Sequence, residues 1–420
     1  MAMAYVGQNI PHDSAAGHVS GASLFVDDLA PVRGEVVVGV VGSPVAHGRV
    51  KSVDLSAARA VPGVIAVLTH QDIPGHNRFG PVVADEDLLV VDQSQYIGHP
   101  IVLIAAETLA ALAAAQKAVR IDIQELEPIL SIDRAIERAS FLCPPRKIER
   151  GQVDAALACS PRVIEGVLQI AGQEHFYLES QAAIVYPGER RTFTVHSSTQ
   201  HTTEVQSLVA EALGIPFSHV TCICKRMGGG FGGKETQAAQ PAMLAALAAH
   251  ATGRAARFTY SKDDDMRFTG KRHPFKAIYR AGFNDDGTLN AVDIRLYSDG
   301  GCSTDLSLAV LERAMLHADN AYFVPNFRVI GQACRTNFPS NTAFRGFGGP
   351  QGVAVIENIV EEIARTLGID ALDVRMRNVY GFESRNIAPY GQTIRNNTLP
   401  ELFAKLRRDC EYDRRRAEIE

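Results

Sequence analysis

Short apolar runs alternate with polar or glycine-containing breaks along the first third of the chain. The runs are rich in β-branched residues and are bounded by Gly, Pro or Asp, which is typical of strands. We expect strands at Glu35–Gly42, Gly63–Thr69, Ile101–Ala105 and Arg120–Gln124. The alanine-rich stretch Thr108–Val119 predicts a helix, and residues 1–20 have no regular pattern. Strands mixed with a helix predict a compact α/β or α+β domain over residues 1–125.

The pattern weakens over residues 126–150. This stretch carries Pro128, Pro144 and Pro145, and basic residues follow them. Because proline interrupts both helices and central strands, we interpret the stretch as a linker on the surface.

Regular patterns return over residues 151–420, which we expect to form a second domain. Thr192–His196 alternates like a strand, and Glu204–Leu213 places its apolar residues on one helical face before Gly214. Further expected elements are a strand at Val220–Cys224, an alanine-rich helix up to about His250, and a hairpin of Phe275–Phe283 with Thr288–Tyr297. The charged tail up to Glu420 has a helix-like composition.

Two glycine-rich loops interrupt the second domain. Lys225–Glu235 reads KRMGGGFGGKE, Ala343–Gly352 reads AFRGFGGPQG, and both contain G-F-G-G just before a predicted helix. Bare backbone at such a loop can approach a ligand closely and point N–H groups at it, especially at an anion. A tight turn between two elements is the alternative. Two such loops in one domain suggest two walls of one site.

Composition narrows the class of protein. The 420 residues are 46% hydrophobic and 21% charged with a net charge of −5, which is ordinary for a globular protein and offers no basic face for nucleic acid. We find no secretory signal and no membrane-spanning stretch, so we expect a cytoplasmic protein. The seven scattered cysteines match no iron–sulfur run and suggest reduced thiols. A metal pair at Cys222 and Cys224 is the alternative to core packing there.

Several polar residues lie near the two loops. Gln200 follows a predicted strand, Glu235 closes the first loop, and Arg313 lies in a predicted helix. Each also has an ordinary interpretation, respectively a solvated turn residue, an N-terminal helix carboxylate and a surface helix arginine. Arg345 lies inside the second loop, where a guanidinium can bind an anionic oxygen with two N–H groups.

Aromatic rings and one histidine complete the candidates. Phe231 and Phe347 are each flanked by glycines, so neither has a local partner, and both suit contact with a planar ligand. For His175 we prefer a structural role. No phosphate-binding P-loop, dinucleotide fingerprint, hydrolase elbow or zinc motif occurs. The residues therefore suit a large anionic cofactor and a flat, polar substrate.

Five motifs, in order, resemble the molybdenum-binding part of the xanthine dehydrogenase/aldehyde oxidase family. They are GQEHFYLE (Gly172–Glu179), SSTQ (Ser197–Gln200), KRMGGGFGGKE (Lys225–Glu235), ERAMLHADN (Glu312–Asn320) and NTAFRGFGGPQG (Asn341–Gly352). Residues 1–125 resemble the family's hammerhead domain, so residues 151–420 would be the first molybdopterin-binding domain. Nearly the whole chain is covered.

The resemblance implies a molybdenum–molybdopterin cofactor and residue roles around it. Gln200, Gly230, Phe231, Gly232 and Arg345 would contact the cofactor, with Gln200, Phe231 and Arg345 near the metal without being its ligands. Glu235 and Arg313 would bind the substrate, and Phe347 would stack on its ring. Glu235 together with Arg313 favours the purine branch, which oxidises hypoxanthine and xanthine to urate; aldehyde oxidation is the alternative.

The chain also departs from the family pattern. The family's base glutamate lies in a G-x-G-E motif of a second molybdenum domain, and nothing before Glu420 supplies it. We therefore expect a C-terminal molybdenum domain and a partner subunit with [2Fe-2S] and FAD, in a hetero-oligomer. The alternative is a non-catalytic cofactor-binding or assembly module.

Overall fold

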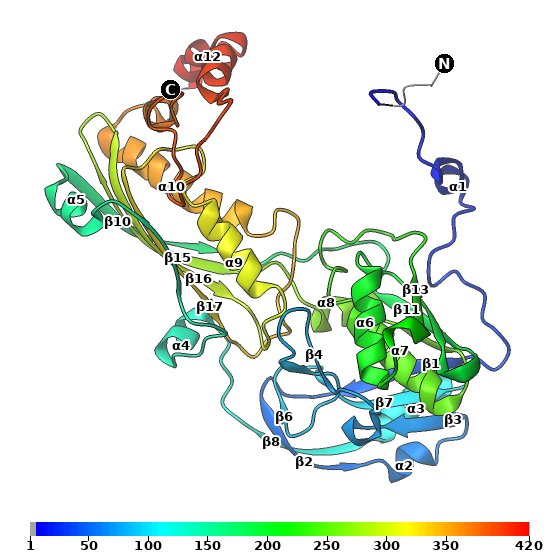
Figure 1. The fold of residues 1–420 in the computed structure, drawn as a ribbon. Helices are drawn as coiled ribbons and strands as arrows, with labels where there is room; N and C mark the ends of the chain where they lie inside the picture. Colours follow the sequence, from blue (N-terminus) through cyan, green and yellow to red (C-terminus); the bar gives the residue numbers. More distant parts are fainter. Residues whose placement is uncertain (1–5, 420) are drawn as a thin grey trace. The chain divides into compact units, whose positions relative to one another are not determined.

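The apolar runs pair into two large sheets, one in each of two units. The computed structural model describes residues 6–419 (Figure 1). Residues up to Glu127 together with His175–Gly270 form unit 1, and Pro128–Glu174 together with the residues from Lys271 onward form unit 2. Each unit is therefore built from two separate stretches of sequence.

A seven-stranded mixed sheet forms the centre of unit 1. Its order is β13-β12-β11-β14-β1-β7-β3, so strands from the first 106 residues pair directly with strands from beyond residue 181. The join is the parallel pairing of β1 with β14, in which Val36 lies opposite Ala256. The bounds are β1 Val36–Gly42, β3 Val64–Leu68, β7 Pro100–Ala106, β11 Ala182–Pro187, β12 Phe193–Ser197, β13 Val220–Ile223 and β14 Ala256–Thr259.

Helices cover both faces of this sheet. Alternate residues of β7 point to opposite sides, so Leu103 packs with α6 and α7 whereas Val102 packs with α2 and α3. Every residue of β7 is buried, as expected for a strand covered on both faces. The helices of unit 1 are α1 Ala15–Ser20, α2 Ser56–Arg59, α3 Leu109–Ala118, α6 Thr202–Leu213, α7 Ala239–Thr252 and α8 Lys262–Phe268.

Smaller elements complete unit 1. A three-stranded antiparallel sheet has the order β6-β2-β8, and a two-stranded pair joins β4 to β5. Their bounds are β2 Gly48–Asp54, β4 Arg78–Phe79, β5 Glu86–Asp87, β6 Gln93–Ser94 and β8 Arg120–Glu125. Short 3₁₀ turns occur at η1 His70–Asp72, η2 Glu189–Arg191 and η3 Phe217–His219.

Unit 2 is built on a five-stranded sheet of order β10-β15-β16-β17-β9. The β15–β16 hairpin buries one face under α9 and α10, while α5 packs on Ala291 of the other face. The strands are β9 Arg146–Arg150, β10 Arg162–Ile170, β15 Phe275–Phe283, β16 Leu289–Asp299 and β17 Asn326–Cys334. The helices are α4 Ile132–Glu137, α5 Val153–Cys159, α9 Ser307–Leu316, α10 Gly349–Leu367, α11 Ala371–Asn378, α12 Leu399–Asp409 and α13 Tyr412–Ile419.

The mixed α/β architecture and the strands expected from the sequence are confirmed. One local expectation is wrong, because residues 1–20 have no regular pattern in the sequence but include the short helix α1. The stretch 126–150, interpreted as a surface linker, contains α4 and β9, and β9 pairs with β17. Its role as a linker remains a prediction. The domain boundaries expected at residues 125 and 150 remain a prediction. In the structure, the segment up to Glu127 packs with His175–Gly270 in one unit.

Helices α9 and α10 approach closely at one glycine. A Cβ atom built on Gly352 would lie 2.1 Å from the carbonyl oxygen of Ala314, whereas one on Gly349 would lie 3.5 Å from its nearest neighbour, His317. Intrinsic propensity alone favours Ala over Gly inside a helix. At Gly352 the contact with a backbone atom overrides that preference, because α9 would have to move away.

We therefore expect Gly352→Ala to lower the free energy of unfolding of unit 2 by about 1–3 kcal/mol, the usual cost of overpacking. Gly349→Ala, in the same helix, is the matched control and should leave stability unchanged or slightly increased. Equilibrium denaturation followed by circular dichroism measures both. Equal effects of the two substitutions would show that the close approach of α9 and α10 has no energetic weight.

Candidate functional site

The two G-F-G-G sequences form the same backbone turn. Gly233 donates its N–H to the carbonyl of Gly230 at 2.7 Å, and Gly349 donates to Gly346 at 3.0 Å. The central Phe-Gly pair has positive φ in both turns, 53° and 101° at Phe231 and Gly232, and 50° and 93° at Phe347 and Gly348. These values are typical of a type I′ turn, in which a non-glycine residue at the first central position is strained. The first turn lies in unit 1 and the second in unit 2.

Gln200 holds the first glycine loop in place. Its side-chain Oε1 accepts hydrogen bonds from the N–H groups of Gly232 at 2.9 Å and Lys234 at 3.3 Å. Its own backbone N–H donates to the carbonyl of Lys234 at 2.8 Å. A Cβ on Gly230 would lie 2.5 Å from that Oε1, so a larger residue there would displace the Gln200 side chain from its hydrogen bonds. The sequence-predicted residues Gln200, Gly230, Phe231 and Gly232 are therefore brought together in unit 1.

Beneath the loop lies a lysine that the sequence did not single out. The Lys234 side chain is fully buried, and its Nζ donates to the Glu179 carbonyl at 2.6 Å, to Ser198 Oγ at 2.7 Å and to Glu179 Oε2 at 3.2 Å. It also lies 4.5 Å above the ring of Tyr177. Burial lowers the pKa of Lys234 below its ordinary value, and the Glu179 charge offsets part of that change.

Glu179 connects both ends of the same loop. Its Oε2 accepts the N–H of Gly228 at 2.7 Å, and its backbone N–H donates to the Gly228 carbonyl at 3.1 Å. The carboxylate thus accepts a hydrogen bond from Gly228, the first glycine of the loop, and forms a salt bridge with Lys234, near the end of the loop. A charge-assisted bond at each end fixes the loop more firmly than neutral bonds would.

A second layer of buried polar groups supports this pair. The Tyr177 hydroxyl donates to Asp265 Oδ1 at 2.7 Å, and Gln181 donates its backbone N–H to the other carboxylate oxygen at 2.8 Å. The Gln181 side chain in turn donates to the Gly233 carbonyl at 3.1 Å. Burial raises the pKa of Tyr177 far above its usual range, so its hydroxyl remains a donor. The whole loop therefore rests on a hydrogen-bonded base within unit 1.

The top of the loop presents unused donors. Within residues 6–419, the backbone N–H groups of Gly229, Gly230 and Phe231 donate no hydrogen bond, and the Phe231 side chain is 47% exposed. Successive free N–H groups form a concave anion-binding surface. The loop therefore has the donor chemistry that a phosphate or a metal-bound oxygen requires.

In unit 2, Arg313, Arg345 and Phe347 lie around the second glycine loop. A Cβ on Gly348 would lie 2.0 Å from the Val310 carbonyl of α9, so the loop touches the helix that carries Arg313. Arg313 and Arg345 are exposed, and their guanidinium groups make no hydrogen bond or ion pair among the described residues. Phe347 has no local partner among its flanking glycines, but it is half-buried against the core of unit 2.

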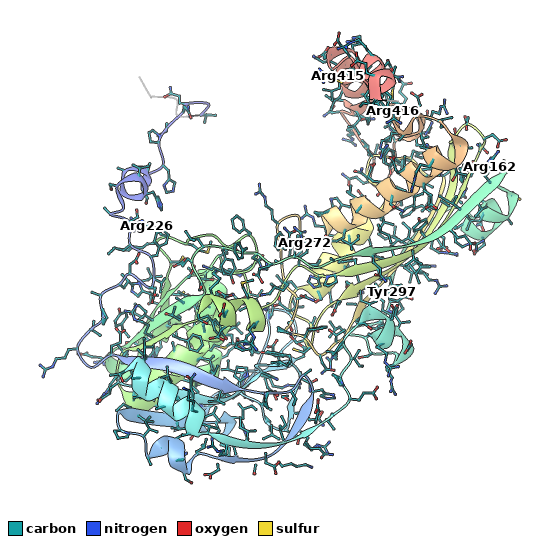
Figure 2. The ribbon with its side chains drawn as sticks, turned by 180° about the vertical axis from the view of Figure 1, so that it is seen from behind. Arg162, Arg226, Arg272, Tyr297, Arg415 and Arg416 are labelled. Carbon is teal, nitrogen blue, oxygen red and sulfur yellow. The ribbon has the colours of Figure 1, made fainter. Side chains whose placement is uncertain are left out.

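Arg272 supports the second glycine loop, as the buried hydrogen-bonded groups beneath the first loop support that one. It lies just before β15 (Figure 2) and donates from Nη2 to the Arg345 carbonyl at 2.9 Å. Its guanidinium stacks 3.8 Å from the centroid of the Phe344 ring, and Nε donates to the Gln173 side chain at 3.2 Å. Arg272 therefore contacts the two residues just before the G-F-G-G turn, the ring of Phe344 and the carbonyl of Arg345.

His175 and Cys222 both pack inside unit 1. The His175 ring is buried, lies 6.0 Å from the Tyr177 ring, and would be 2.6 Å from a Cβ on Gly233, which fits the structural role expected for it. Burial raises the pKa of the Cys222 thiol to about 12. Over the described part of the chain, no cluster of three or more His, Cys, Asp or Glu residues has metal-binding geometry, and no helix is long and apolar enough to cross a membrane.

Two models of known protein domains match the chain and identify its family. A model of the molybdopterin cofactor-binding domain matches residues 137–379, and the a/b hammerhead domain of aldehyde oxidase and xanthine dehydrogenase matches residues 20–127. The chain belongs to the xanthine dehydrogenase/aldehyde oxidase family. Both glycine loops and all the candidate residues lie within the match to the cofactor-binding domain.

Relatives of both branches of the family are similar to the chain. It is 41% identical over 99% of its length to a xanthine dehydrogenase of Dictyostelium discoideum and 40% identical over 98% to aldehyde oxidase 2 of Cavia porcellus. It spans 30% and 31% of these two proteins. The aldehyde oxidoreductase of Desulfovibrio gigas has the same fold, with a TM-score of 0.89 and 27% identity, over 98% of this chain and 47% of that one. Overall identity therefore does not separate the two branches.

The ion pair beneath the first loop gives a stability test. Lys234→Met should lower the free energy of unfolding of unit 1 by about 3–5 kcal/mol, because it leaves the Glu179 carboxylate buried without its partner. Arg254→Met, which breaks the exposed pair with Glu107 in the same unit, is the control and should have little effect. Chemical denaturation measures both variants, and a Lys234→Met loss no larger than the control's would contradict the proposed anchoring.

Proposed function

We propose that this chain is the cofactor- and substrate-binding part of a molybdenum hydroxylase that oxidises hypoxanthine and xanthine to urate. One observation carries the purine assignment. Glu235 follows the first loop and Arg313 lies beside the second, and neither side chain makes a hydrogen bond or ion pair among residues 6–419. Each charge is uncommitted within its own unit, and we infer that both bind the substrate.

The chemistry of the two groups fits a purine. A carboxylate accepts hydrogen bonds from ring N–H groups, and a guanidinium stabilises negative charge that develops on a ring-bound oxygen. An aldehyde offers a single acceptor oxygen and no N–H donor, so an acid such as Glu235 would have no partner on it. The pair therefore supports a purine over an aldehyde.

The residues also fit a molybdopterin cofactor. The free N–H groups of Gly229, Gly230 and Phe231 suit its oxygen atoms, and the unpaired Arg345 guanidinium suits an anionic one. When bound, the molybdenum centre supplies the oxygen transfer and takes up the substrate's electrons. In this proposal the chain's residues hold the cofactor, orient the purine through Glu235 and Arg313, and Phe347 stacks on its ring.

The proposal includes partners. The seven cysteines have no iron–sulfur spacing, so electrons would leave through an iron–sulfur and FAD subunit, with a C-terminal molybdenum domain supplying the base glutamate. This arrangement is consistent with a chain that spans 30% of its Dictyostelium relative. We place the assembly in the cytoplasm.

Aldehyde oxidation is the second candidate function. The observation that favours it is the 40% identity to the Cavia aldehyde oxidase, which equals the 40% identity to the xanthine dehydrogenase/oxidase of Mus musculus. The two candidates differ in what they require of Arg313, because only the purine reaction uses it to stabilise charge on the substrate.

Arg313→Met in the complete enzyme, with cofactor and partner subunit, tests this difference. Purine kcat should fall by roughly 10²-fold or more, as on loss of one group that stabilises transition-state charge, whereas aldehyde turnover should change little. Arg295→Met, an exposed arginine on β16, is the control for the loss of a surface charge. An unchanged purine rate, or equal losses with purine and aldehyde, would remove the proposed role of Arg313.

A further inference from the structure

A second carboxyl group lies beside the glycine loop of unit 1 and has no place in the proposed site. Glu204 is in the first turn of α6, and its side chain is only 14% exposed. Its Oε2 lies 3.2 Å from His201 Nδ1. Its Oε1 is buried and has no hydrogen-bond partner among the described residues. A half-satisfied carboxyl in this position costs free energy, so its presence requires an explanation.

Hydrogen bonds connect the segment that precedes Glu204 to the residue that precedes Glu235. Gln200 donates its N–H to the Lys234 carbonyl at 2.8 Å, and the Thr199 hydroxyl donates to the same carbonyl at 3.3 Å. The residues just before α6 are thus tied to the residue just before Glu235. Both segments belong to unit 1, and Lys234 itself is anchored from below. Two hydrogen bonds therefore connect the segment just before α6 to the end of the loop.

Two titratable groups act on the pKa of the Glu204 carboxyl, namely His201 and Glu235. Burial raises the pKa of Glu204, His201 lowers it, and the Glu235 charge raises it again. Among the elements packed on α6, η3 carries His219 and β12 carries His196, which are titratable groups. The buried length of α7 presents alanine, leucine and methionine with Gln240 as its polar residue, and β13 presents Cys222 as a neutral thiol.

We propose that Glu204 is a positioning residue for Glu235, which it holds under like-charge repulsion so that Glu235 preferentially binds N–H donors of the substrate. The inference rests on the proposed function, since it assigns Glu235 to the substrate. An N–H donor disperses the charge of Glu235 and so relieves the repulsion from Glu204, which adds to binding. A ligand atom that only accepts hydrogen bonds gives no such relief, so the pair selects for ring N–H groups.

Steady-state kinetics of the complete enzyme test the selection. With Glu204→Gln, which keeps shape and removes the charge, purine KM should rise about 5- to 10-fold near pH 8, while kcat stays within about twofold. In the unmodified enzyme purine KM should also rise as the pH falls through the pKa of Glu204, because the repelling charge is then lost. The variant should lack this rise. A structural defect would instead lower kcat or stability at every pH.

Glu211→Gln is the matched control, because Glu211 lies on the same helix and its carboxylate accepts a hydrogen bond from Ser207. It should change neither KM nor the pH profile. A purine KM unaffected by Glu204→Gln at every pH would overturn the proposal.

A second measurement is independent of activity. In the full chain labelled with ¹³C at glutamate carboxyls, the resonance lost in Glu204→Gln identifies Glu204, and Glu235→Gln should move its titration midpoint to lower pH. An unmoved midpoint would overturn the proposal. The proposed function fails in a different way, if the unmodified enzyme does not oxidise purines, and that result leaves the measured coupling of the two carboxyls intact.

Discussion

The salt bridge between Lys234 and Glu179 is the interaction on which the first glycine loop depends. A fully buried ammonium group is costly, and here it is offset by a carboxylate, a carbonyl and a hydroxyl at hydrogen-bond distance. Because Glu179 also binds Gly228, one ion pair fixes both ends of a loop whose glycines would otherwise leave it mobile. The free N–H groups at the top of the loop are thereby fixed before a ligand binds, so binding does not have to order the loop.

The second loop reaches the same turn by different means. Glycines at 348 and 352 let α9 approach the loop and α10 directly, and Arg272 binds the loop backbone from the side. The two loops thus share the G-F-G-G turn and differ in their supports. This difference predicts different failures, since unit 1 is sensitive to loss of a charge and unit 2 to added volume.

The sequence predicted what depends on local pattern. Strand and helix positions followed from apolar periodicity, and the glycine clusters marked both loops because few other roles tolerate so many glycines. Local pattern does not reveal which distant segments pair with one another. The pairing of β1 with β14 and the strand β9 in a proline-rich stretch were therefore not predicted. Lys234, Glu204 and Arg272 were missed as functional residues because nothing local distinguishes a buried charged side chain from a surface one. A lysine directly after a glycine cluster is the one signal that was present.

The central claim is that the unpaired charges of Glu235 and Arg313 make this chain part of a purine hydroxylase. Its most direct test is to compare kcat/KM for hypoxanthine and xanthine with that for aliphatic and aromatic aldehydes, using the complete unmodified enzyme. We predict that the purines are the better substrates by at least about tenfold, which corresponds to one well-formed charged hydrogen bond. Efficient turnover of aldehydes with no turnover of either purine would contradict it.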